Sequence, residues 1–214
     1  MSEISTKDQA APDKSALRDA ATVIVLRDRM EAPQVLMGQR GSKAAFMPSK
    51  FVFPGGAVDA GDAEVPLART VEPLCAARLG EEMRAASDAR LVHALQPAAI
   101  RELWEETGLM LGAPGAWEAP PAPDWERFAA ARHLPSAQGM QFVFRAITPP
   151  GRPRRFDARF FLVDADRITG DLDDFSAACE ELSHLHWVPL AEARALDLPF
   201  ITEVVLAEIE ARAR

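Results

Sequence analysis

Three glutamates, Glu102, Glu105 and Glu106, are the feature that most constrains this chain. On a helix the positions i, i+3 and i+4 lie above one another on one face. Such a row repels itself unless positive charge lies against it, and Arg101, which can pair with Glu105, cannot neutralise all three. A divalent cation can, because hard cations such as magnesium take carboxylate oxygens together with substrate phosphates. The row therefore predicts a helix that carries a site for phosphate chemistry.

Length and composition favour one soluble domain. The chain has 214 residues, of which 48% are hydrophobic and 26% charged, as is typical of globular proteins. Its net charge of −8 argues against a general nucleic-acid or membrane-surface binder, and no apolar run approaches the roughly 18 residues of a membrane span. Residues 1–18 are polar, without an apolar signal core, and we expect a flexible leader there.

The two cysteines, Cys75 and Cys179, have no metal-ligand spacing. Two isolated thiols favour a reducing compartment. We therefore expect a cytoplasmic protein without nucleic-acid or membrane partners.

Short β-branched and aromatic runs predict strands at 21–26, 34–40, 51–53, 141–147, 158–163 and 185–188. A helical run over 91–95 should break near Pro97, and the helix with the carboxylate row should start at Ala98 and end at Gly108. Further helices are expected at 124–132, capped by Asp124, at 191–196 and at 201–214. Strands interspersed with helices predict an α+β or mixed α/β sandwich over residues 19–214.

Two segments together resemble the Nudix box, which runs Gly, five residues, Glu, seven residues, then Arg-Glu-(apolar)-x-Glu-Glu-x-Gly-(apolar). The first segment is Phe53-Pro54-Gly55-Gly56, and the second is 101–109. Gly56 matches the opening glycine. The defined positions of the second half are all matched, by Arg101, Glu102, Leu103, Glu105, Glu106, Gly108 and Leu109. The resemblance implies a Nudix-type α/β/α sandwich with a mixed sheet.

The chain departs from the box in two ways. Asp62 stands where the family has glutamate, and 38 residues, not seven, separate Asp62 from Arg101. Closing a longer loop costs only about 0.6 kcal/mol per doubling, so both halves can still meet if residues at about 63–97 fold outward as a helical insert. Such an insert is similar to that of coenzyme A diphosphatases with an interrupted box. It could be a cap, a wall of the substrate site or the surface of a homodimer.

The resemblance also implies roles for single residues. It implies Mg²⁺ or Mn²⁺ held by Glu102, Glu105, Glu106 and the backbone carbonyl of Gly55. Glu102 would in addition help to activate water, and Arg101 would orient it, so that Arg101, Glu102 and Glu105 form the catalytic set. The reaction would be hydrolysis of a nucleoside diphosphate linked to another moiety.

More residues are candidates for the same site. Many family members take one further carboxylate from a loop before the last strand, where this chain has Glu180 and Glu181. Arginine forks suit phosphate, and the candidates for binding substrate phosphate are Arg40, Arg152, Arg154 and Arg155. The alternative for all of these residues, and for Arg159, is a solvated surface charge.

The insert and the segment 148–161 favour coenzyme A or acyl-CoA as substrate. A related branch with an uninterrupted box has a signature before the glycines. This chain matches that signature at Arg40 and at Phe-Pro-Gly-Gly, but it has Ser49 where the signature has glycine. ADP-ribose or a dinucleotide such as NADH is the alternative substrate. A non-catalytic Nudix module that binds a nucleotide as a sensor is the alternative of another class, although binding alone needs no activated water. A purely structural domain is disfavoured by the self-repelling row.

Overall fold

The computed structural model describes residues 16–44, 47–81, 83–85, 87 and 89–213. One mixed sheet forms its centre, with strands in the order β3-β2-β1-β8-β7, and β4 and β9 pair with β1 and β2. The strands are β1 (Leu17–Arg27), β2 (Gln34–Arg40), β3 (Phe51–Val52), β4 (Gly55–Ala57), β7 (Gln141–Ile147), β8 (Arg155–Asp164) and β9 (Leu182–Pro189). A two-stranded sheet joins β5 (Gly112–Pro114) to β6 (His133–Pro135).

The central strand β1 has a different partner along each edge. β8 runs parallel to it, from Leu17 opposite Arg155 to Leu26 opposite Asp164. On the other edge, β4 and β2 follow one another as antiparallel partners. Because β1 begins at Leu17, Leu17 and Arg18 belong to the sheet and not to the expected leader; residues 1–15 lie outside the described part of the chain.

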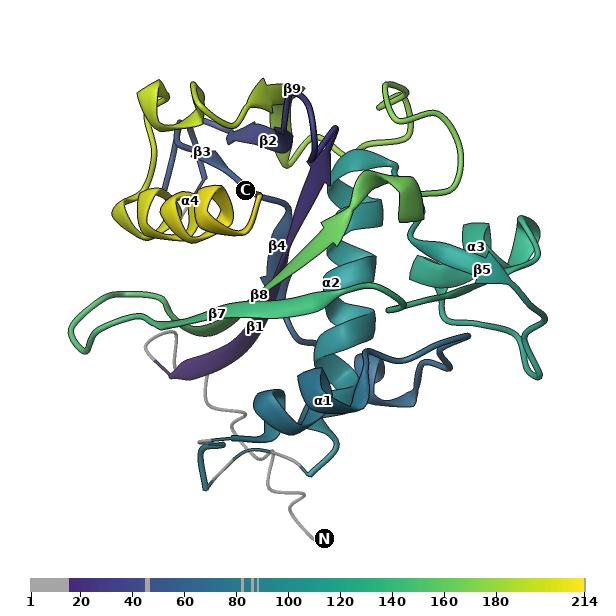
Figure 1. The fold of residues 1–214 in the computed structure, drawn as a ribbon. Coiled ribbons are helices and arrows are strands. Elements are labelled where there is room, and N and C mark those ends of the chain that lie inside the picture. The colour runs from purple at the N-terminus through teal and green to yellow at the C-terminus, as the bar shows by residue number, and fades with distance from the viewer. Residues whose placement is uncertain (1–15, 45–46, 82, 86, 88, 214) are drawn as a thin grey trace, which may run out of the picture.

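Helices cover both faces of the sheet, as Figure 1 shows for α2 and α4. The helical elements are η1 (Ala60–Glu64), α1 (Pro73–Gly80), α2 (Leu91–Thr107), η2 (Pro123–Trp125), α3 (Glu126–Ala130), η3 (Ala165–Arg167), η4 (Ala193–Ala195) and α4 (Phe200–Arg212). Successive β1 side chains point to opposite faces, so that Val23 and Val25 join the core under α2 while Ile24 and Leu26 join the core under α4. The α/β/α sandwich is therefore confirmed.

α2 runs through Pro97 without a break, so the expected start at Ala98 is wrong. A proline inside a helix costs about 3 kcal/mol, but it removes only one backbone donor. Leu95, Ile100 and Leu103 on this helix are completely buried, and tertiary packing of this kind outweighs propensity. The helix ends as expected at Gly108, which is left-handed with φ 77° and donates its N–H to the carbonyl of Trp104.

The segment between the two halves of the box does not fold outward. Its one helix among the described residues is α1, and residues 91–97, which were expected to belong to the insert, form the first turns of α2. Val65, Val71 and Leu79 are buried in the core under α2. The backbone N–H of Val71 donates to Gln96 Oε1 at 3.0 Å. These residues complete the core rather than extend from it.

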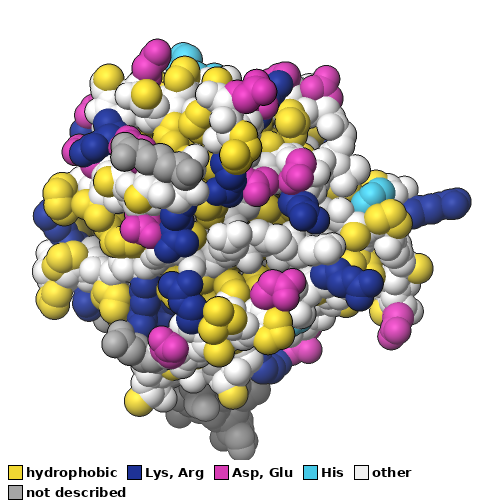
Figure 2. Space-filling model, in the orientation of Figure 1, with side chains coloured by type: hydrophobic (Ala, Val, Ile, Leu, Met, Phe, Trp, Pro, Cys, Tyr) yellow, Lys and Arg dark blue, Asp and Glu magenta, His cyan; other side chains and the backbone are white. Residues whose placement is uncertain are grey.

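Other expectations differ in detail. The expected helix at 124–132 is the short pair η2 and α3, and the Asp124 side chain caps neither. The run at 191–196 contains only η4. No helix within the described ranges is long and apolar enough to cross a membrane. On the face drawn in Figure 2, acidic and basic side chains are interspersed, so no single-sign patch dominates it.

A network of ion pairs joins the first halves of β1 and β8, which contain Asp19, Asp157 and Arg159. The Arg159 side chain, only 2% exposed, pairs with Asp19 at 2.6 Å and with Asp157 at 3.2 Å. Arg145 also binds Asp157, through two hydrogen bonds of 2.8 Å. These ion pairs lower the pKa of Asp157 even though its burial acts in the opposite direction. Arg84 bonds to both carboxylates and so ties the segment before α2 to the sheet.

Replacing Arg159 tests this network. Arg159→Met removes one charged partner from Asp19 and from Asp157, which keep Arg84, so the free energy of unfolding should fall by about 1.5–3 kcal/mol. Arg18→Met is the matched control, because Arg18 and Asp59 are 59% and 63% exposed and 3.8 Å apart, and such pairs contribute about 0–1 kcal/mol. Urea unfolding measures both. Equal losses in the two variants would contradict the structural role of Arg159.

Candidate active site

Two adjacent glycines in β4 bring the first half of the box against α2. A side chain at Gly55 would place its Cβ 2.6 Å from the carbonyl oxygen of Ala21, and one at Gly56 would place it 2.4 Å from Glu102 Oε1. Only glycine fits at Gly55, where the close atoms are backbone, whereas a side chain at Gly56 would displace the Glu102 carboxylate. The backbone N–H of Gly55 donates to Glu106 Oε2 at 2.7 Å. The glycine turn and the carboxylate row thus lie in direct contact.

Arg101 is the buried centre of this site, with 5% of its surface exposed. Its Nε and Nη2 bind the two oxygens of Asp62, each at 3.1 Å. Its Nη1 donates to Glu102 at 2.9 Å and to Glu105 at 3.2 Å. Burial alone would lower the pKa of Arg101, but the bonds to Asp62 and the nearby carboxylates raise it. The guanidinium is therefore permanently charged, and it is bonded to Glu102.

Asp62 has a larger role than sequence reasoning assigned to it. It is 2% exposed and binds Arg101 with both oxygens, while its Oδ2 also accepts from the backbone N–H of Asp59 at 2.8 Å. The signal was present in the sequence as two acidic residues three apart at a helix start, a pattern typical of reciprocal capping. The shorter side chain, compared with glutamate, still reaches Arg101 because η1 places it directly against α2.

All three glutamates of the row have raised pKa values. Burial raises the pKa of Glu102 to about 7, although the neighbouring Arg101 acts in the opposite direction. Burial also raises the pKa of Glu105, and that of Glu106 well above its ordinary value. A single arginine does not compensate the desolvation of three carboxylates. The row is therefore short of positive charge, as the sequence predicted.

The donor set fits a hard divalent cation. It consists of carboxylate oxygens with excess negative charge, which suits Mg²⁺ or Mn²⁺ and not a thiophilic metal. In the part of the chain that the structure describes, however, no three acidic, histidine or cysteine side chains converge as an ion cage. Glu102 and Glu105 turn toward Arg101, and Glu106 turns toward Gly55. Binding an ion would require these side chains to rotate toward a common point.

Of the two candidate carboxylates, Glu181 is the one that is bonded to Arg40 and acts electrostatically on the row. Arg40 Nη2 donates to Glu181 Oε1 at 2.9 Å, and the charge of Glu181 helps to raise the pKa of Glu102 and Glu106. The loop that carries it is attached to α2, since the backbone N–H of Cys179 donates to the carbonyl of Glu105 at 2.8 Å. Glu180 is exposed, and no hydrogen bond among the described residues joins it to the row.

The arginines of the β7–β8 hairpin lie elsewhere. The hairpin projects away from α2 (Figure 1), and Arg152 and Arg154 at its tip are exposed. Arg155 donates to the carbonyl of Thr148 at 3.2 Å, within the same hairpin. Among described residues no contact joins the three to the carboxylate row, so their role in substrate binding stays a prediction. Arg159, whose alternative was an exposed charge, is buried in the ion network.

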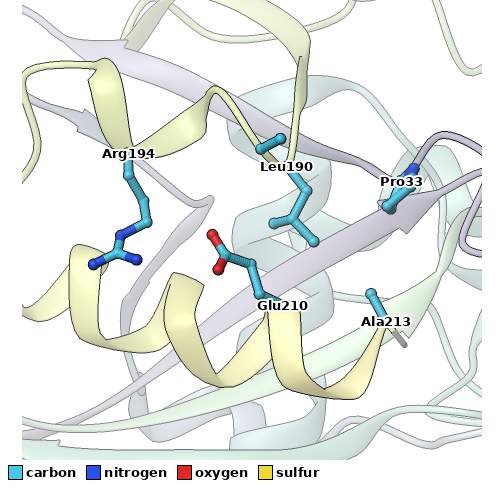
Figure 3. A pocket seen from close by; sticks show the side chains of 6 residues that line it. Pro33, Leu190, Arg194, Glu210 and Ala213 are labelled. Carbon is cyan, nitrogen blue, oxygen red and sulfur yellow. The ribbon is translucent and has the colours of Figure 1, made fainter.

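A pocket of about 560 Å³ lies on the α4 side of the sheet, where Arg194 and Glu210 extend into it (Figure 3). Leu190 and Pro33 line it as well. None of its lining residues belongs to the expected site. This pocket therefore has no part in the carboxylate chemistry.

Ser49 stands where the related signature has glycine, and its backbone conformation is one that glycine adopts more easily. Its φ is +61°, a left-handed conformation that costs most residues roughly 1–2 kcal/mol. Ser49→Gly should therefore raise the free energy of unfolding by about 0.5–1 kcal/mol. Ser42→Gly on the same loop is the control, because Ser42 is not a positive-φ position and glycine there only adds unfolded-state entropy. Thermal unfolding would contradict the assignment if both variants lost stability.

The raised pKa of Glu102 predicts a pH-dependent stability. Its folded pKa of about 7 exceeds the ordinary value of 4.5, so the stabilisation is present below about pH 4.5 and is lost as pH rises through 7. Glu102→Gln removes this dependence and should gain up to about 3 kcal/mol relative to the parent between pH 5 and pH 8.5. Urea unfolding in EDTA measures the difference. A difference between Glu102→Gln and the parent that stays constant with pH would refute it, and Glu208→Gln on α4 serves as the control.

Comparison with known proteins gives relatives of one kind. "Putative nudix hydrolase 7" of Caenorhabditis elegans is 30% identical over 186 residues, which are 81% of this chain and 52% of that protein. The chain thus spans about half the length of this curated relative. No family model matches the chain.

Solved structures agree with the sequence comparison. A NUDIX hydrolase from Alicyclobacillus acidocaldarius has a TM-score of 0.62 and 27% identity, and the match covers 90% of each chain. The NUDIX domain of Shewanella oneidensis NrtR, solved with ADP ribose, shares the fold with a TM-score of 0.52, 14% identity and coverage of 93% and 90%. The relatives found by sequence and by structure carry the same description, Nudix hydrolase or NUDIX domain. The chain is thus similar to Nudix hydrolases in sequence and in fold.

Proposed function

We propose that the chain hydrolyses a nucleoside diphosphate linked to another moiety, with Mg²⁺ or Mn²⁺ as cofactor and coenzyme A or acyl-CoA as substrate. The observation that carries the proposal is the buried Arg101, which holds Glu102 and Glu105 beside the Gly55–Gly56 turn. The insertion between Asp62 and Arg101 favours coenzyme A over ADP-ribose or NADH.

The proposed reaction is the attack of water on one phosphorus of the diphosphate. A new P–O bond forms, the bridging P–O bond breaks, and two phosphate monoesters leave. The divalent cation would neutralise the diphosphate and polarise the attacking water. Glu102 suits a proton acceptor, because its pKa of about 7 lies near neutral pH. Arg101 holds the Glu102 carboxylate in place through its Nη1.

The proposed ligands are Glu102, Glu105, Glu106 and the carbonyl of Gly55, joined by Glu181. Their support is the excess negative charge of the row and its contact with the glycine turn. Arg40 is the arginine whose position supports contact with substrate phosphate, since its side chain reaches Glu181 at the row.

A substrate panel tests the function directly. The purified protein is incubated with Mg²⁺ and coenzyme A, ADP-ribose, NADH or diadenosine polyphosphates, and the products are identified by mass. Release of 3′,5′-ADP and 4′-phosphopantetheine is expected. Turnover of ADP-ribose or NADH alone would exclude the coenzyme A assignment. Tight binding of one compound without turnover of any would instead support a sensor module.

Glu106→Gln tests the site. The variant keeps an oxygen that can accept the Gly55 N–H, so the fold should survive, but it loses the carboxylate charge. Turnover should fall by at least about 100-fold, within the range for losing a group that acts in the transition state. Glu208→Gln, an exposed carboxylate paired with Arg212 on α4, should keep full turnover. Full turnover by Glu106→Gln would show that the row is not the catalytic site.

A further inference from the structure

Only one of the two donor groups on the side edge of the Arg40 guanidinium forms a hydrogen bond among the described residues. That edge consists of Nε and Nη2, whose N–H groups point the same way and suit two acceptor oxygens. Nη2 donates to Glu181 at 2.9 Å. Nε is buried, and among the described residues it has no hydrogen-bond acceptor. A buried donor without an acceptor costs free energy, so this edge is incomplete in the free protein.

Arg101 shows what a complete edge is in this same site. Its Nε and Nη2 bind both oxygens of Asp62, each at 3.1 Å. Glu181 offers Arg40 one bond where Asp62 offers Arg101 two. The Glu181 side chain is 53% exposed and the Asp62 side chain only 2% exposed. The Arg40–Glu181 pair is therefore the weaker and the more easily exchanged of the two.

The Arg40–Glu181 pair lies next to the carboxylate row. The loop that carries Glu181 is attached to the helix of the row, since the backbone N–H of Cys179 donates to the carbonyl of Glu105 at 2.8 Å. Arg40 holds the Glu181 carboxylate through its Nη2. A Glu181 side chain that leaves Arg40 therefore remains next to the row and can add a carboxylate to it.

We propose that Arg40 is a positioning residue that holds Glu181 in the free protein and exchanges it for a phosphate of the substrate. A phosphate has several oxygens and can accept from Nε and Nη2 together, which completes the edge. Glu181 is then released toward the row, where its charge strengthens cation binding. Substrate and cation consequently bind cooperatively, because each favours the separated pair and coupling of this kind is reciprocal. The inference rests on the proposed function.

A double-mutant cycle tests the exchange. Mn²⁺ affinity is measured by electron paramagnetic resonance, without nucleotide, for the parent, Arg40→Gln, Glu181→Gln and the double variant. In the parent background Arg40 holds Glu181 away from the ion, so Glu181→Gln should weaken Mn²⁺ binding less than it does in the Arg40→Gln background. In the Arg40→Gln background Glu181 is free, and its loss should weaken Mn²⁺ binding by about fivefold or more. Equal effects in both backgrounds would overturn the proposal.

A nucleotide analogue supplies the second arm. α,β-Methylene-ADP, which resists hydrolysis, should take the edge of Arg40 and make the parent as sensitive to Glu181→Gln as the Arg40→Gln protein. If its presence leaves that sensitivity unchanged, the exchange does not occur. Arg40→Lys keeps the charge but not the two-donor edge, so in this variant the analogue should bind more weakly and should not raise the sensitivity. This variant serves if Arg40→Gln fails to fold.

The controls separate the two levels of the hypothesis. Arg194→Gln removes an arginine from the pocket on the α4 side and should leave Mn²⁺ affinity unchanged. A parent protein that binds no Mn²⁺ would refute the proposed function and this inference together. A parent that binds Mn²⁺ and turns over substrate, with a cycle that shows no coupling, would refute this inference alone.

Discussion

The site depends on one buried ion pair, between Arg101 and Asp62. Two hydrogen bonds of 3.1 Å join their side chains, which are 6% and 2% exposed. Charges so deeply buried are tolerated only when they are paired and hydrogen-bonded. The pair attaches η1 to α2, and with it the chain that follows the glycine turn. Arg101 also donates to the carbonyl of Ala57 at 3.0 Å, so the same side chain holds β4.

The rest of the site follows from that pair. With one edge of Arg101 occupied by Asp62, only its Nη1 remains for Glu102 and Glu105. Among the described residues no arginine forms a hydrogen bond with Glu106, which accepts from the N–H of Gly55. Glu106 is buried and Glu102 and Glu105 are partly buried, and this desolvation raises the pKa values of all three, since one arginine compensates for it only in part. The arrangement is unfavourable by itself, and the cation proposed as cofactor would offset the excess negative charge.

Sequence reasoning succeeded where local chemistry decides structure. β2 and β7 match the expected ranges, and Gly108 ends α2, because alternation and a left-handed glycine are local signals. It failed where packing decides. Pro97 did not break α2, since complete burial of Leu95 and Ile100 outweighs the cost of a proline. Nor does the segment before α2 form an outward helical insert, because Val65 and Val71 are needed in the core.

The sequence by itself determined the chemistry of the site: the spacing of Glu102, Glu105 and Glu106 requires one helical face, and one arginine cannot neutralise it. The two glycines before it were equally readable as places where only a bare backbone fits. Tertiary structure alone decided which distant residues complete the site. Asp62 meets Arg101 and Arg40 meets Glu181 across 39 and 141 residues of chain. Contacts over such separations depend on how strands and loops pack, and a local pattern carries no record of that packing.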